Sequence, residues 1–432
     1  FRNILKINVE DNMEKIIVRG GKKLQGEVDI SVAKNSVLPI IVATILNPTE
    51  IILKKVPMLE DVTVLINLLR ELNCEVQFSS ITGDLKINTL NLKEVDPNSE
   101  LIRKMRASFL VMGPMLARFG RCKISMPGGC NIGSRPVDLH LKGFKSLGIE
   151  SEIGYGYVEA KVDKLHGNRI YLDFPSVGAT ENIMMAAILA PGITVIENAA
   201  EEPEIWDLAR FLNSMGAKIE GAGYGKITIH GVSQLKQPEQ FTPIFDRIEA
   251  GTFMVAAGIT NSKITINGVN EEHLMPTIEK LKECGVYCSI DGQKMIVDGT
   301  QEKKPVDIKT MPYPGFPTDM QAQIMALLSI TRGVSVITET VFENRFMHVG
   351  ELGRMGANIK IDGRIAIVEG VSTLTGCEVK ATDLRAGAAM ILAGLVANGE
   401  TEIGEVYHID RGYTNIEEKF RKLGAEIYRV HK

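Results

Sequence analysis

The segment Asn415-Ile-Glu-Glu-Lys-Phe-Arg-Lys-Leu423-Gly424-Ala425-Glu426-Ile-Tyr-Arg-Val430 decides the fold, because its pattern recurs along the chain. The spacing of its apolar residues predicts an amphipathic helix over Asn415–Leu423. Gly424 follows at the position where a left-handed residue ends a helix. The alternating residues from Glu426 then predict a half-buried strand.

The three-residue phrase at the end of this helix occurs six times. Its copies are Leu72-Asn73-Cys74, Leu147-Gly148-Ile149, Met215-Gly216-Ala217, Cys284-Gly285-Val286, Met355-Gly356-Ala357 and Leu423-Gly424-Ala425. The central residues lie 68 to 75 positions apart, so six similar units fill the 432 residues. A repeat of this kind indicates that one supersecondary unit is built several times.

Each unit also has an earlier and more apolar helix. These segments are Asn35–Leu46, Arg106–Phe119, Ala179–Ala190, Ala250–Ile259, Met320–Ile330 and Arg385–Ala397. A helix that is apolar nearly all round is buried. The predicted unit is therefore strand–helix–strand–helix–strand, an α/β repeat with its first helix inside. The repeat alone does not choose between one ring of six units and two lobes of three.

The composition is that of a globular protein and not of a disordered or fibrous chain. Hydrophobic residues make up 44% and charged residues 24%, and the formal net charge is -4. This balance excludes a disordered chain, a collagen and a coiled coil. A net-acidic chain also disfavours a nucleic-acid coat, although a local basic site is still possible.

The sequence favours a reduced, cytoplasmic protein. Its longest apolar stretches, Met184–Ala190 and Ala386–Ala397, are shorter than a membrane-spanning helix. Six cysteines do not form the dense pattern of a disulfide framework. Residues 1–12 lack the features of a secretory signal, and Met13 looks like a natural start. We therefore expect residues 1–12 to be an added or disordered extension.

Cations stand where the helix dipole alone would not favour them. Lys34 and Arg106 lie at the starts of apolar helices, where a bound anion would explain a positive side chain. Arg135, Arg345 and Arg411 occupy comparable loops in three units. If the units pack with symmetry, these residues and Arg385 form one basic pocket. Arginine forks bind carboxylate and phosphate, so the expected substrate is small and multiply negative.

Cys130 is the one cysteine whose surroundings favour reactivity. It stands in the loop Pro127-Gly128-Gly129-Cys130, with Arg135 and a helix start close behind. A neighbouring cation and a helix N-terminus both favour the thiolate. The other cysteines indicate no metal site, since Cys284 and Cys288 lack a second pair with zinc spacing.

At this point the sequence resembles the UDP-N-acetylglucosamine enolpyruvyl transferase (1-carboxyvinyltransferase) family. The resemblance runs from Met13 to the C-terminus. Its motifs are Pro127-Gly-Gly-Cys130-Asn-Ile-Gly-Ser-Arg135-Pro-Val-Asp-Leu-His140, Ala33-Lys34-Asn35, Met105-Arg106-Ala107-Ser108, Ser176-Val-Gly-Ala-Thr180, Phe316-Pro-Thr-Asp319, Glu343-Asn-Arg345, Asp383-Leu-Arg385 and Asp410-Arg411-Gly412-Tyr413.

The resemblance implies a two-domain, inside-out α/β barrel of six repeats, with helices inside sheets and the active site in the interdomain cleft. Residues 34–244 would form a continuous domain with repeats 1–3 and the Cys130 loop. Residues 13–33 together with 245–432 would form the second domain, with repeats 4–6.

The family's reaction transfers the enolpyruvyl group of phosphoenolpyruvate to the 3′-hydroxyl of UDP-N-acetylglucosamine and releases phosphate, by addition and elimination. This is the first committed step of peptidoglycan synthesis, and no cofactor or metal is expected. The resemblance makes Cys130 the general acid, a site of covalent adducts and the target of the inhibitor fosfomycin. The catalytic residues would be Cys130, Asp319, Lys34, Asn35 and Arg411. The substrate-binding residues would be Lys34, Asn35, Arg106, Arg135, Pro136, Val137, Asp138, Leu139, His140, Ser176, Val177, Gly178, Asp319, Val341, Phe342, Arg345, Arg385 and Arg411.

Three alternatives stay open at the level of the sequence. The shikimate-pathway enolpyruvyl transferase, 3-phosphoshikimate 1-carboxyvinyltransferase, shares the fold and mechanism, but its family uses no such cysteine. A catalytically silent paralogue would bind nucleotide sugar without turnover. A six-unit ring around DNA would carry cations along inner helix faces, whereas the inner helices here are apolar.

Overall fold

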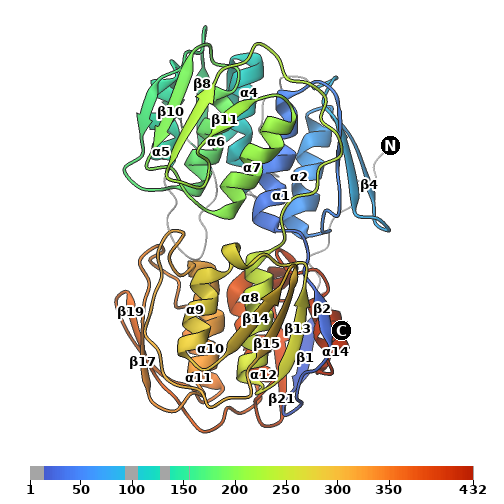
Figure 1. Ribbon diagram of the computed structural model, residues 1–432, viewed down its shortest axis with the longest axis vertical. Coiled ribbons are helices and arrows are strands. Elements are labelled where there is room, and N and C mark those ends of the chain that lie inside the picture. The colour runs from blue at the N-terminus through green and yellow to red at the C-terminus, as the bar shows by residue number, and fades with distance from the viewer. Residues whose placement is uncertain (1–13, 93–105, 127–136, 155, 432) are drawn as a thin grey trace.

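The chain folds into two lobes of similar build, one above the other in Figure 1. The computed structural model describes residues 14–92, 106–126, 137–154 and 156–431, apart from the side chains of residues 106–108. Each lobe has its own hydrophobic core. The core of the upper lobe is made of residues between Val32 and Phe241, and that of the lower lobe of residues from Ile16 to Val28 and from Ile248 to Ile427.

The upper lobe alternates helices with short strands. Its helices are α1 (Lys34–Ala43), η1 (Thr44–Leu46), α2 (Glu60–Glu71), η2 (Arg106–Val111), α4 (Met112–Phe119), α5 (Asp138–Ser146), α6 (Val177–Ala187) and α7 (Pro203–Ser214). Its strands are β3 (Glu50–Leu53), β4 (Glu75–Ser79), β5 (Asp84–Asn88), β6 (Arg121–Ser125), β7 (Glu150–Ile153), β8 (Tyr157–Lys161), β9 (Arg169–Tyr171), β10 (Ile193–Glu197), β11 (Lys218–Glu220) and β12 (Lys226–His230).

The lower lobe has the same alternation and takes in both described ends of the chain. Its helices are α8 (Arg247–Ile259), η3 (Glu271–His273), α9 (Met275–Glu283), η4 (Thr318–Met320), α10 (Gln321–Leu328), α11 (His348–Arg354), α12 (Leu384–Gly394), α13 (Tyr407–Asp410) and α14 (Ile416–Lys422). Its strands are β1 (Lys15–Arg19), β2 (Glu27–Asp29), β13 (Lys263–Asn267), β14 (Tyr287–Asp291), β15 (Lys294–Asp298), β16 (Ile308–Lys309), β17 (Val334–Thr338), β18 (Asn358–Asp362), β19 (Ile365–Glu369), β20 (Glu378–Lys380), β21 (Glu400–Gly404) and β22 (Glu426–Val430).

Every predicted helix-ending phrase has the expected backbone. The central residue of each copy has a positive φ, from 62° at Asn73 to 94° at Gly356. The residue after it donates its N–H to a carbonyl five residues back, as Ala425 does to Phe420 at 3.0 Å. This bond satisfies a carbonyl that the helix end would otherwise leave without a donor. The phrase therefore ends each amphipathic helix and leads the chain into the following strand.

The observed unit has one strand more than the sequence predicts. In the third unit β9 pairs parallel with β10, β10 pairs antiparallel with β12, and β12 pairs antiparallel with β11. The sheet order is β11-β12-β10-β9. The glycine-rich stretch between Gly221 and Gly225 is the hairpin turn that joins β11 to β12. The glycines from Gly221 to Gly225 indicate this hairpin between two strands in the third unit, whereas the three-strand pattern inferred for every unit leaves out its second arm, β12.

The N-terminal strands complete sheets whose other strands come from much later in the sequence. β1 lies between β21 and β22, with Ile17 opposite both Glu402 and Tyr428. β2 pairs parallel with β13. In the upper lobe the corresponding place beside β3 is taken by an isolated bridge between Leu53 and Phe241. The lower lobe is thus completed by strands that precede the upper lobe in the sequence, and the upper lobe by its own last segment at Phe241.

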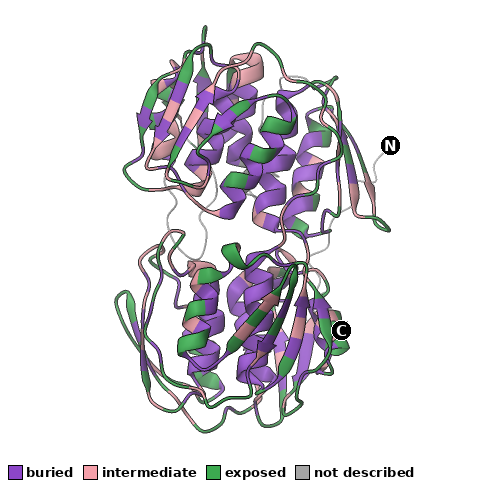
Figure 2. Ribbon diagram, in the orientation of Figure 1, coloured by how far each residue is buried: buried purple, intermediate pink, exposed green. Residues whose placement is uncertain are grey.

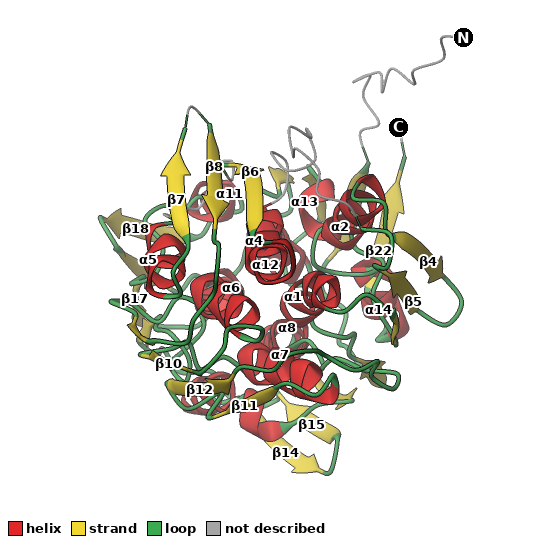
Figure 3. Ribbon diagram, turned by 90° about the horizontal axis from the view of Figure 1, so that it is seen from above, coloured by secondary structure: helices red, strands yellow, loops and turns green. Residues whose placement is uncertain are grey.

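The apolar helices lie inside the lobes, as predicted. α1, α4 and α6 occupy the middle of the upper lobe, and α8, α10 and α12 the middle of the lower lobe (Figures 2 and 3). All 13 residues of α8 are buried. Small residues let neighbouring helices approach closely: a Cβ on Gly113 would lie 2.4 Å from the Asn182 carbonyl oxygen of α6. The two-domain α/β fold with helices inside sheets is confirmed, although the sheets of the described residues stay separate and do not close into a barrel.

The chain crosses between the lobes at two neighbouring segments. Val32 forms an antiparallel bridge with Phe245, and the Ala33 N–H donates to the Ile244 carbonyl at 2.8 Å. The expected domain boundaries fall at this pairing. They stay a prediction, which the pairing favours, and the expected extension 1–12 lies outside the described residues.

None of the helices in the described part of the chain combines the length and apolar character needed to cross a membrane.

Packing of the inner helices predicts a large cost for truncating Phe253. Its ring is fully buried and lies 4.8 Å from that of Phe420, so it joins α8 to α14. We expect Phe253→Ala to lower the free energy of unfolding by about 3–5 kcal/mol, measured by urea denaturation. Phe174→Ala is the control: its side chain is 45% exposed, and we expect a change below about 1 kcal/mol. Equal losses in the two variants would contradict the buried placement of α8.

Candidate active site

Asp319 lies between two buried arginines of the lower lobe. It stands in the first turn of η4, and its side chain is 28% exposed. Arg345 donates from Nη2 to Oδ1 at 2.9 Å, and Arg385 donates from Nη2 to Oδ2 at 3.0 Å. The two arginine side chains are each only 4% exposed. Asp319 and Arg345 come from the fifth repeat and Arg385 from the sixth, so the packing of neighbouring repeats brings the three side chains together.

A second carboxylate, Asp61, joins cations from both lobes. Asp61 lies in the first turn of α2 and is buried. Its Oδ2 is 3.2 Å from Nζ of Lys34, at the start of α1 in the same lobe. Its Oδ1 is 3.0 Å from Nε of Arg411, which follows α13 in the other lobe. The ion pair between Asp61 and Arg411 therefore spans the lobe junction.

These six side chains form one charge cluster, defined here as Lys34, Asp61, Asp319, Arg345, Arg385 and Arg411. Lys34 links the pairs around Asp61 to the pairs around Asp319. The charges of Asp61, Arg385, Arg411 and Asp319 all shift its pKa. Four cations face two carboxylates, which leaves a formal surplus of two positive charges. Among the described residues, Nε and Nη1 of buried Arg385 have no hydrogen-bond acceptor. Buried charges and donors without partners are costly, so the cluster is built to receive an anion.

The pKa shifts within the cluster follow from burial and from these pairs. Burial raises the pKa of the Asp319 carboxyl, but Arg385 and Arg345 outweigh it and hold that pKa well below its usual range. Burial lowers the pKa of the Lys34 amine, and the Asp61 carboxylate opposes that effect. The pKa of Arg385 is raised, because Asp319 outweighs the effect of burial. The lowered pKa values of Asp319 and Asp61 and the raised pKa of Arg385 hold these three groups in their charged forms.

Glu339 fixes the backbone beside Asp319. Its buried carboxylate accepts from the Val341 N–H at 2.8 Å, from the Phe342 N–H at 3.1 Å and from the Thr318 hydroxyl at 2.9 Å. Glu339 thereby links the Val341–Phe342 loop to the residue that precedes Asp319. Glu339 therefore anchors Val341 and Phe342, which are expected to bind the sugar, and the backbone next to Asp319, the expected catalytic carboxylate.

The start of α6 forms a second group of expected binding residues. Ser176 caps this helix through its side chain, which accepts from the Ala179 N–H at 3.3 Å. Gly178 faces His140 of α5, since a Cβ on Gly178 would lie 3.4 Å from the ring. Asn182 joins the group to η2: its Nδ2 donates to the Phe109 carbonyl at 3.0 Å and lies 3.1 Å from Nδ1 of His140. Val177 lies half-buried in the first turn of α6.

Other expected residues lie at the edge of the described chain or outside it. Cys130, Arg135 and Pro136 fall outside the described residues. Arg106 begins η2, but its side chain is not among those described. Of the residues that follow, Val137 is buried, Asp138 is exposed at the start of α5, and Leu139 is half-buried. Asn35, next to Lys34, is half-buried in α1.

The sequence analysis missed Asp61 and Glu339. Asp61 reads as an ordinary first-turn acid in the amphipathic helix, a position that the helix dipole favours without any ligand. Glu339 reads as a loop residue after a strand. One signal was available for Glu339: Val341 and Phe342 have backbone N–H groups just beyond it, and a carboxylate commonly accepts from the residues that follow it. Nothing in the sequence places Asp61 next to Arg411.

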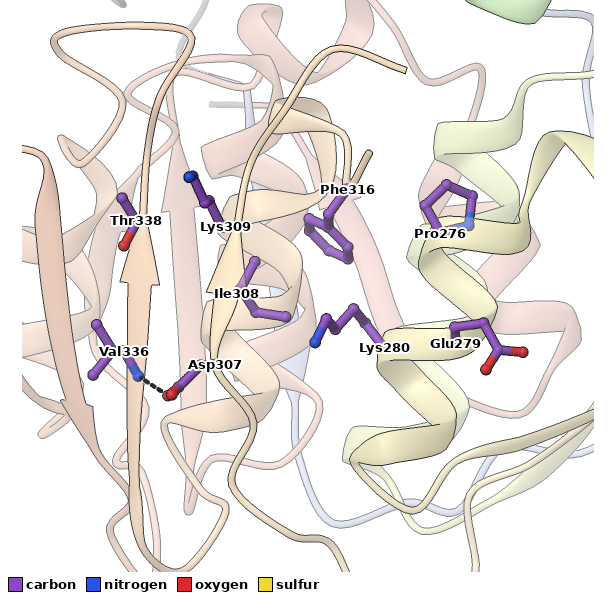
Figure 4. Close-up of a pocket in the computed structure, with 9 residues that line it drawn as sticks. All are labelled: Pro276, Glu279, Lys280, Asp307, Ile308, Lys309, Phe316, Val336 and Thr338. Carbon is purple, nitrogen blue, oxygen red and sulfur yellow. Dashed lines mark hydrogen bonds between the residues drawn. The ribbon is translucent and has the colours of Figure 1, made fainter. Parts of the chain in front are cut away.

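A separate cavity of about 450 Å³ lies on the lower lobe between α9 and the strands β16 and β17 (Figure 4). Its lining residues are Pro276, Glu279, Lys280, Asp307, Ile308, Lys309, Phe316, Val336 and Thr338. It contains no member of the charge cluster. Phe316 belongs to the motif that leads to Asp319, but its buried ring packs in the wall of this cavity. We therefore keep the charge cluster as the candidate site.

The two lobes meet around a charge cluster with a formal surplus of positive charge, as in an enzyme that acts on an anion. The family model of EPSP synthase (3-phosphoshikimate 1-carboxyvinyltransferase) matches residues 18–420. UDP-N-acetylglucosamine 1-carboxyvinyltransferase 2 of Clostridium tetani is 65% identical over 97% of this chain and 100% of its own length. UDP-N-acetylglucosamine 1-carboxyvinyltransferase 1 of Clostridium acetobutylicum is 63% identical over the same shares. The chain belongs to the EPSP synthase family of enolpyruvyl transferases, and within it to the group of UDP-N-acetylglucosamine 1-carboxyvinyltransferases.

Solved structures agree on the fold. The enolpyruvyl transferase NikO from Streptomyces tendae superposes with a TM-score of 0.87 at 22% identity, covering 98% of this chain and 100% of that one. EPSP synthase from Acinetobacter baumannii superposes with a TM-score of 0.72 at 18% identity, covering 97% and 100%. The two-lobe arrangement is therefore common to enolpyruvyl transferases of quite different sequence.

The three hydrogen bonds to Glu339 predict that its loss destabilises the fold. Glu339→Ala leaves two backbone N–H groups and a hydroxyl without their acceptor, so we expect a loss of about 1–3 kcal/mol in unfolding free energy. Urea denaturation measures it. Glu343→Ala is the control four residues away, because Glu343 makes only an exposed ion pair of 3.6 Å with Arg364. We expect that control to change by less than about 1 kcal/mol. A Glu339→Ala variant as stable as the control would show that these bonds do not hold the loop.

Proposed function

We propose that this enzyme transfers the enolpyruvyl group of phosphoenolpyruvate to the 3′-hydroxyl of UDP-N-acetylglucosamine and releases phosphate. The support comes from the full-length relatives of that name, at 63% and 65% identity, and from the surplus positive charge at the lobe junction. The observation that carries the proposal is the charge cluster, because its four cations suit a substrate with both a phosphate and a carboxylate.

In this proposal the cations of the cluster bind phosphoenolpyruvate and steady the phosphate as it leaves. Lys34 and Arg411 approach from opposite lobes, so an anion between them draws the lobes together. Arg345 and Arg385 offer planar forks of the kind that match carboxylate and phosphate oxygens. Four of its six side chains, Lys34, Asp61, Arg345 and Arg385, are buried, and electrostatic stabilisation is stronger where water is excluded. Asn35, beside Lys34, is a further polar group for the reacting centre.

The reaction proceeds by addition and then elimination. A proton is added to C3 of phosphoenolpyruvate, and the sugar hydroxyl oxygen bonds to C2 as it loses its own proton. C3 then loses a proton, the C2–O bond to phosphate breaks, and the enolpyruvyl ether and inorganic phosphate remain. The first step needs an acid near C3 and a carboxylate near the hydroxyl.

Asp319 is the carboxylate that meets the sugar hydroxyl. Clamped by Arg345 and Arg385, it is a weak base, because both cations stabilise its ionised form. A bound substrate anion changes this balance, since it takes a share of both arginines and adds negative charge nearby. Both effects raise the Asp319 pKa toward the range useful for accepting a proton. Substrate binding therefore converts Asp319 from a counterion into an acceptor for the hydroxyl.

The nucleotide sugar occupies the second group of residues. The start of α6 at Ser176, Val177 and Gly178 presents backbone N–H groups, which suit the diphosphate. The loop anchored by Glu339 supplies Val341 and Phe342 beside Asp319. The resemblance assigns further residues to the same substrates. These are Arg106, Arg135, Pro136, Val137, Asp138, Leu139 and His140.

Cys130 is the general acid for C3 in this proposal. Its thiol also forms a covalent adduct with phosphoenolpyruvate and reacts with the epoxide fosfomycin. The assignment comes from the Pro127–His140 motif, because the loop itself lies outside the described residues. The product feeds peptidoglycan synthesis, and so cell-wall formation, cell shape and division. A cytoplasmic location is part of the same proposal.

The rival activity, transfer to shikimate 3-phosphate, has weaker support. EPSP synthase from Acinetobacter baumannii shares the fold at 18% identity, which says nothing of the substrate. The cysteine loop also argues against it. A silent paralogue would keep the sugar-binding residues and lose the cluster, whereas all six members of the cluster are in place here.

Phosphate release is the direct test of the proposed function. We expect release from phosphoenolpyruvate only when UDP-N-acetylglucosamine is present, measured by a colorimetric phosphate assay. Shikimate 3-phosphate serves as the alternative acceptor, and Arg385→Gln, checked for folding by circular dichroism, controls for contaminating phosphatases. Release with shikimate 3-phosphate instead would favour the rival activity. No release from folded enzyme with either acceptor would leave the silent paralogue.

Replacing Cys130 separates its two expected roles. Asp keeps an acidic proton at the position but removes the nucleophilic sulfur, so we expect Cys130→Asp to retain turnover and to lose inactivation by fosfomycin. Cys130→Ala removes both groups, and we expect its turnover to fall by about 10²–10⁴-fold. The phosphate assay with and without fosfomycin measures both. A folded Cys130→Asp variant without turnover would reject the general-acid assignment.

A further inference from the structure

Asp61 is a charged member of the cluster to which the proposed reaction gives no task. Its side chain is 10% exposed, and both of its oxygens are engaged by cations. Lys34 approaches Oδ2 from the same lobe, and Arg411 approaches Oδ1 from the other. A carboxylate beside two cations that are expected to bind a substrate anion is unusual, because it competes with that anion.

The Lys34 amine depends on a neighbouring carboxylate to stay protonated more than the arginines of the cluster do. Burial lowers its pKa, and two neighbouring cations, Arg385 of α12 and Arg411 after α13, lower it further. Two carboxylates oppose them: Asp61 of α2 and Asp319 of η4. Asp319 is already shared between Arg345 and Arg385. Asp61 is therefore the main anion that keeps the Lys34 amine protonated before substrate arrives.

Arg411 needs a fixed partner for a different reason. Its side chain is 37% exposed, far more than those of Arg345 and Arg385, and it lies across the junction from Lys34. An ordered guanidinium loses less entropy when a substrate binds. Bonding of Nε to Asp61 restricts its orientation, as a carboxylate restricts a guanidinium.

We infer that Asp61 is a positioning residue for enolpyruvyl transfer, which holds Lys34 and Arg411 together across the lobe junction so that both meet the phosphoenolpyruvate anion. This inference rests on the proposed function. Asp61 does not touch the reacting atoms; it acts through the two cations. It also lets the lobes approach before substrate binds, since without it two positive charges would face each other there.

We expect a neutral side chain at position 61 to weaken the binding of phosphoenolpyruvate, and to do so on the alkaline side of the pH profile. Without the carboxylate, Lys34 loses its proton at a lower pH, because the charge that favoured its cationic form is gone. Phosphoenolpyruvate binding should therefore weaken on the alkaline side. The KM for UDP-N-acetylglucosamine should change little, because its expected residues lie at α6 and at the Glu339-anchored loop. A purely structural role would lower activity evenly across pH.

The test compares Asp61→Asn with wild type in the phosphate-release assay from pH 6 to pH 10. We expect the KM for phosphoenolpyruvate to rise about tenfold or more, and the alkaline limb of kcat/KM for this substrate to move down by about one pH unit. Asp84→Asn is the matched control, since Asp84 also pairs with a lysine, Lys54, within the same lobe and outside the cluster. We expect wild-type values from it.

The outcomes distinguish this inference from the proposed function. Active wild type together with an unchanged KM and pH profile in Asp61→Asn would overturn the inference alone. Wild type without turnover would overturn the proposed function on which it rests. Circular dichroism checks folding. If Asp61→Asn does not fold, Asp61→Glu replaces it: the retained charge should keep the alkaline limb near wild type, whereas the shifted carboxylate should raise the KM, and an unchanged KM would overturn the inference.

Discussion

The structure depends on one electrostatic constraint: four cations and two carboxylates, most of them buried, must be accommodated together where the lobes meet. Taking such charges out of water is expensive unless each finds a partner of opposite sign. Asp319 satisfies Arg345 and Arg385 within the lower lobe, and Asp61 satisfies Lys34 and Arg411 across the junction. Within the cluster the pairing is incomplete by two charges, and in the proposed function this surplus is what a substrate anion would satisfy.

The repeated fold supplies the geometry for this cluster. Lys34 begins α1, Asp319 lies in the turn before α10, and Arg385 lies in the first turn of α12. The inner helices are apolar almost throughout, so their polar residues are confined to the ends that meet the other lobe. Helix N-termini also favour anions through their free N–H groups and dipole. Because the rest of each inner helix is apolar and buried in the core, its charged end lies at the junction.

Much of this arrangement could be predicted from the sequence, because it repeats. The six helix-ending phrases located the helices and strands, since a left-handed Gly or Asn after an apolar residue has one main structural meaning. Lys34, Arg345, Arg385 and Arg411 were found as cations at matching positions of the repeats. Asp383, part of one family motif, is the cap of α12 and accepts from the Arg385 N–H at 2.8 Å. Asp61 could not be found, because its partner Arg411 lies 350 residues away and in another lobe. The strand partners of β1 and β2 leave no local pattern for the same reason, and only the family resemblance assigned residues 13–33 to the second domain.

The place of β1 has a consequence for how the protein is made. This strand leaves the ribosome before the other described strands, whereas both of its neighbours, β21 and β22, follow all the other described strands. At ~5–20 residues per second, about 20–80 seconds pass between β1 and the strands that must flank it. During that time the upper lobe has all the strands and helices of its own core, while β1, with the apolar residues Ile16, Ile17 and Val18, waits without a sheet. The sheet of β1 is thus completed only once β22 has been synthesised, by a strand that joins an early part of the chain to a late one.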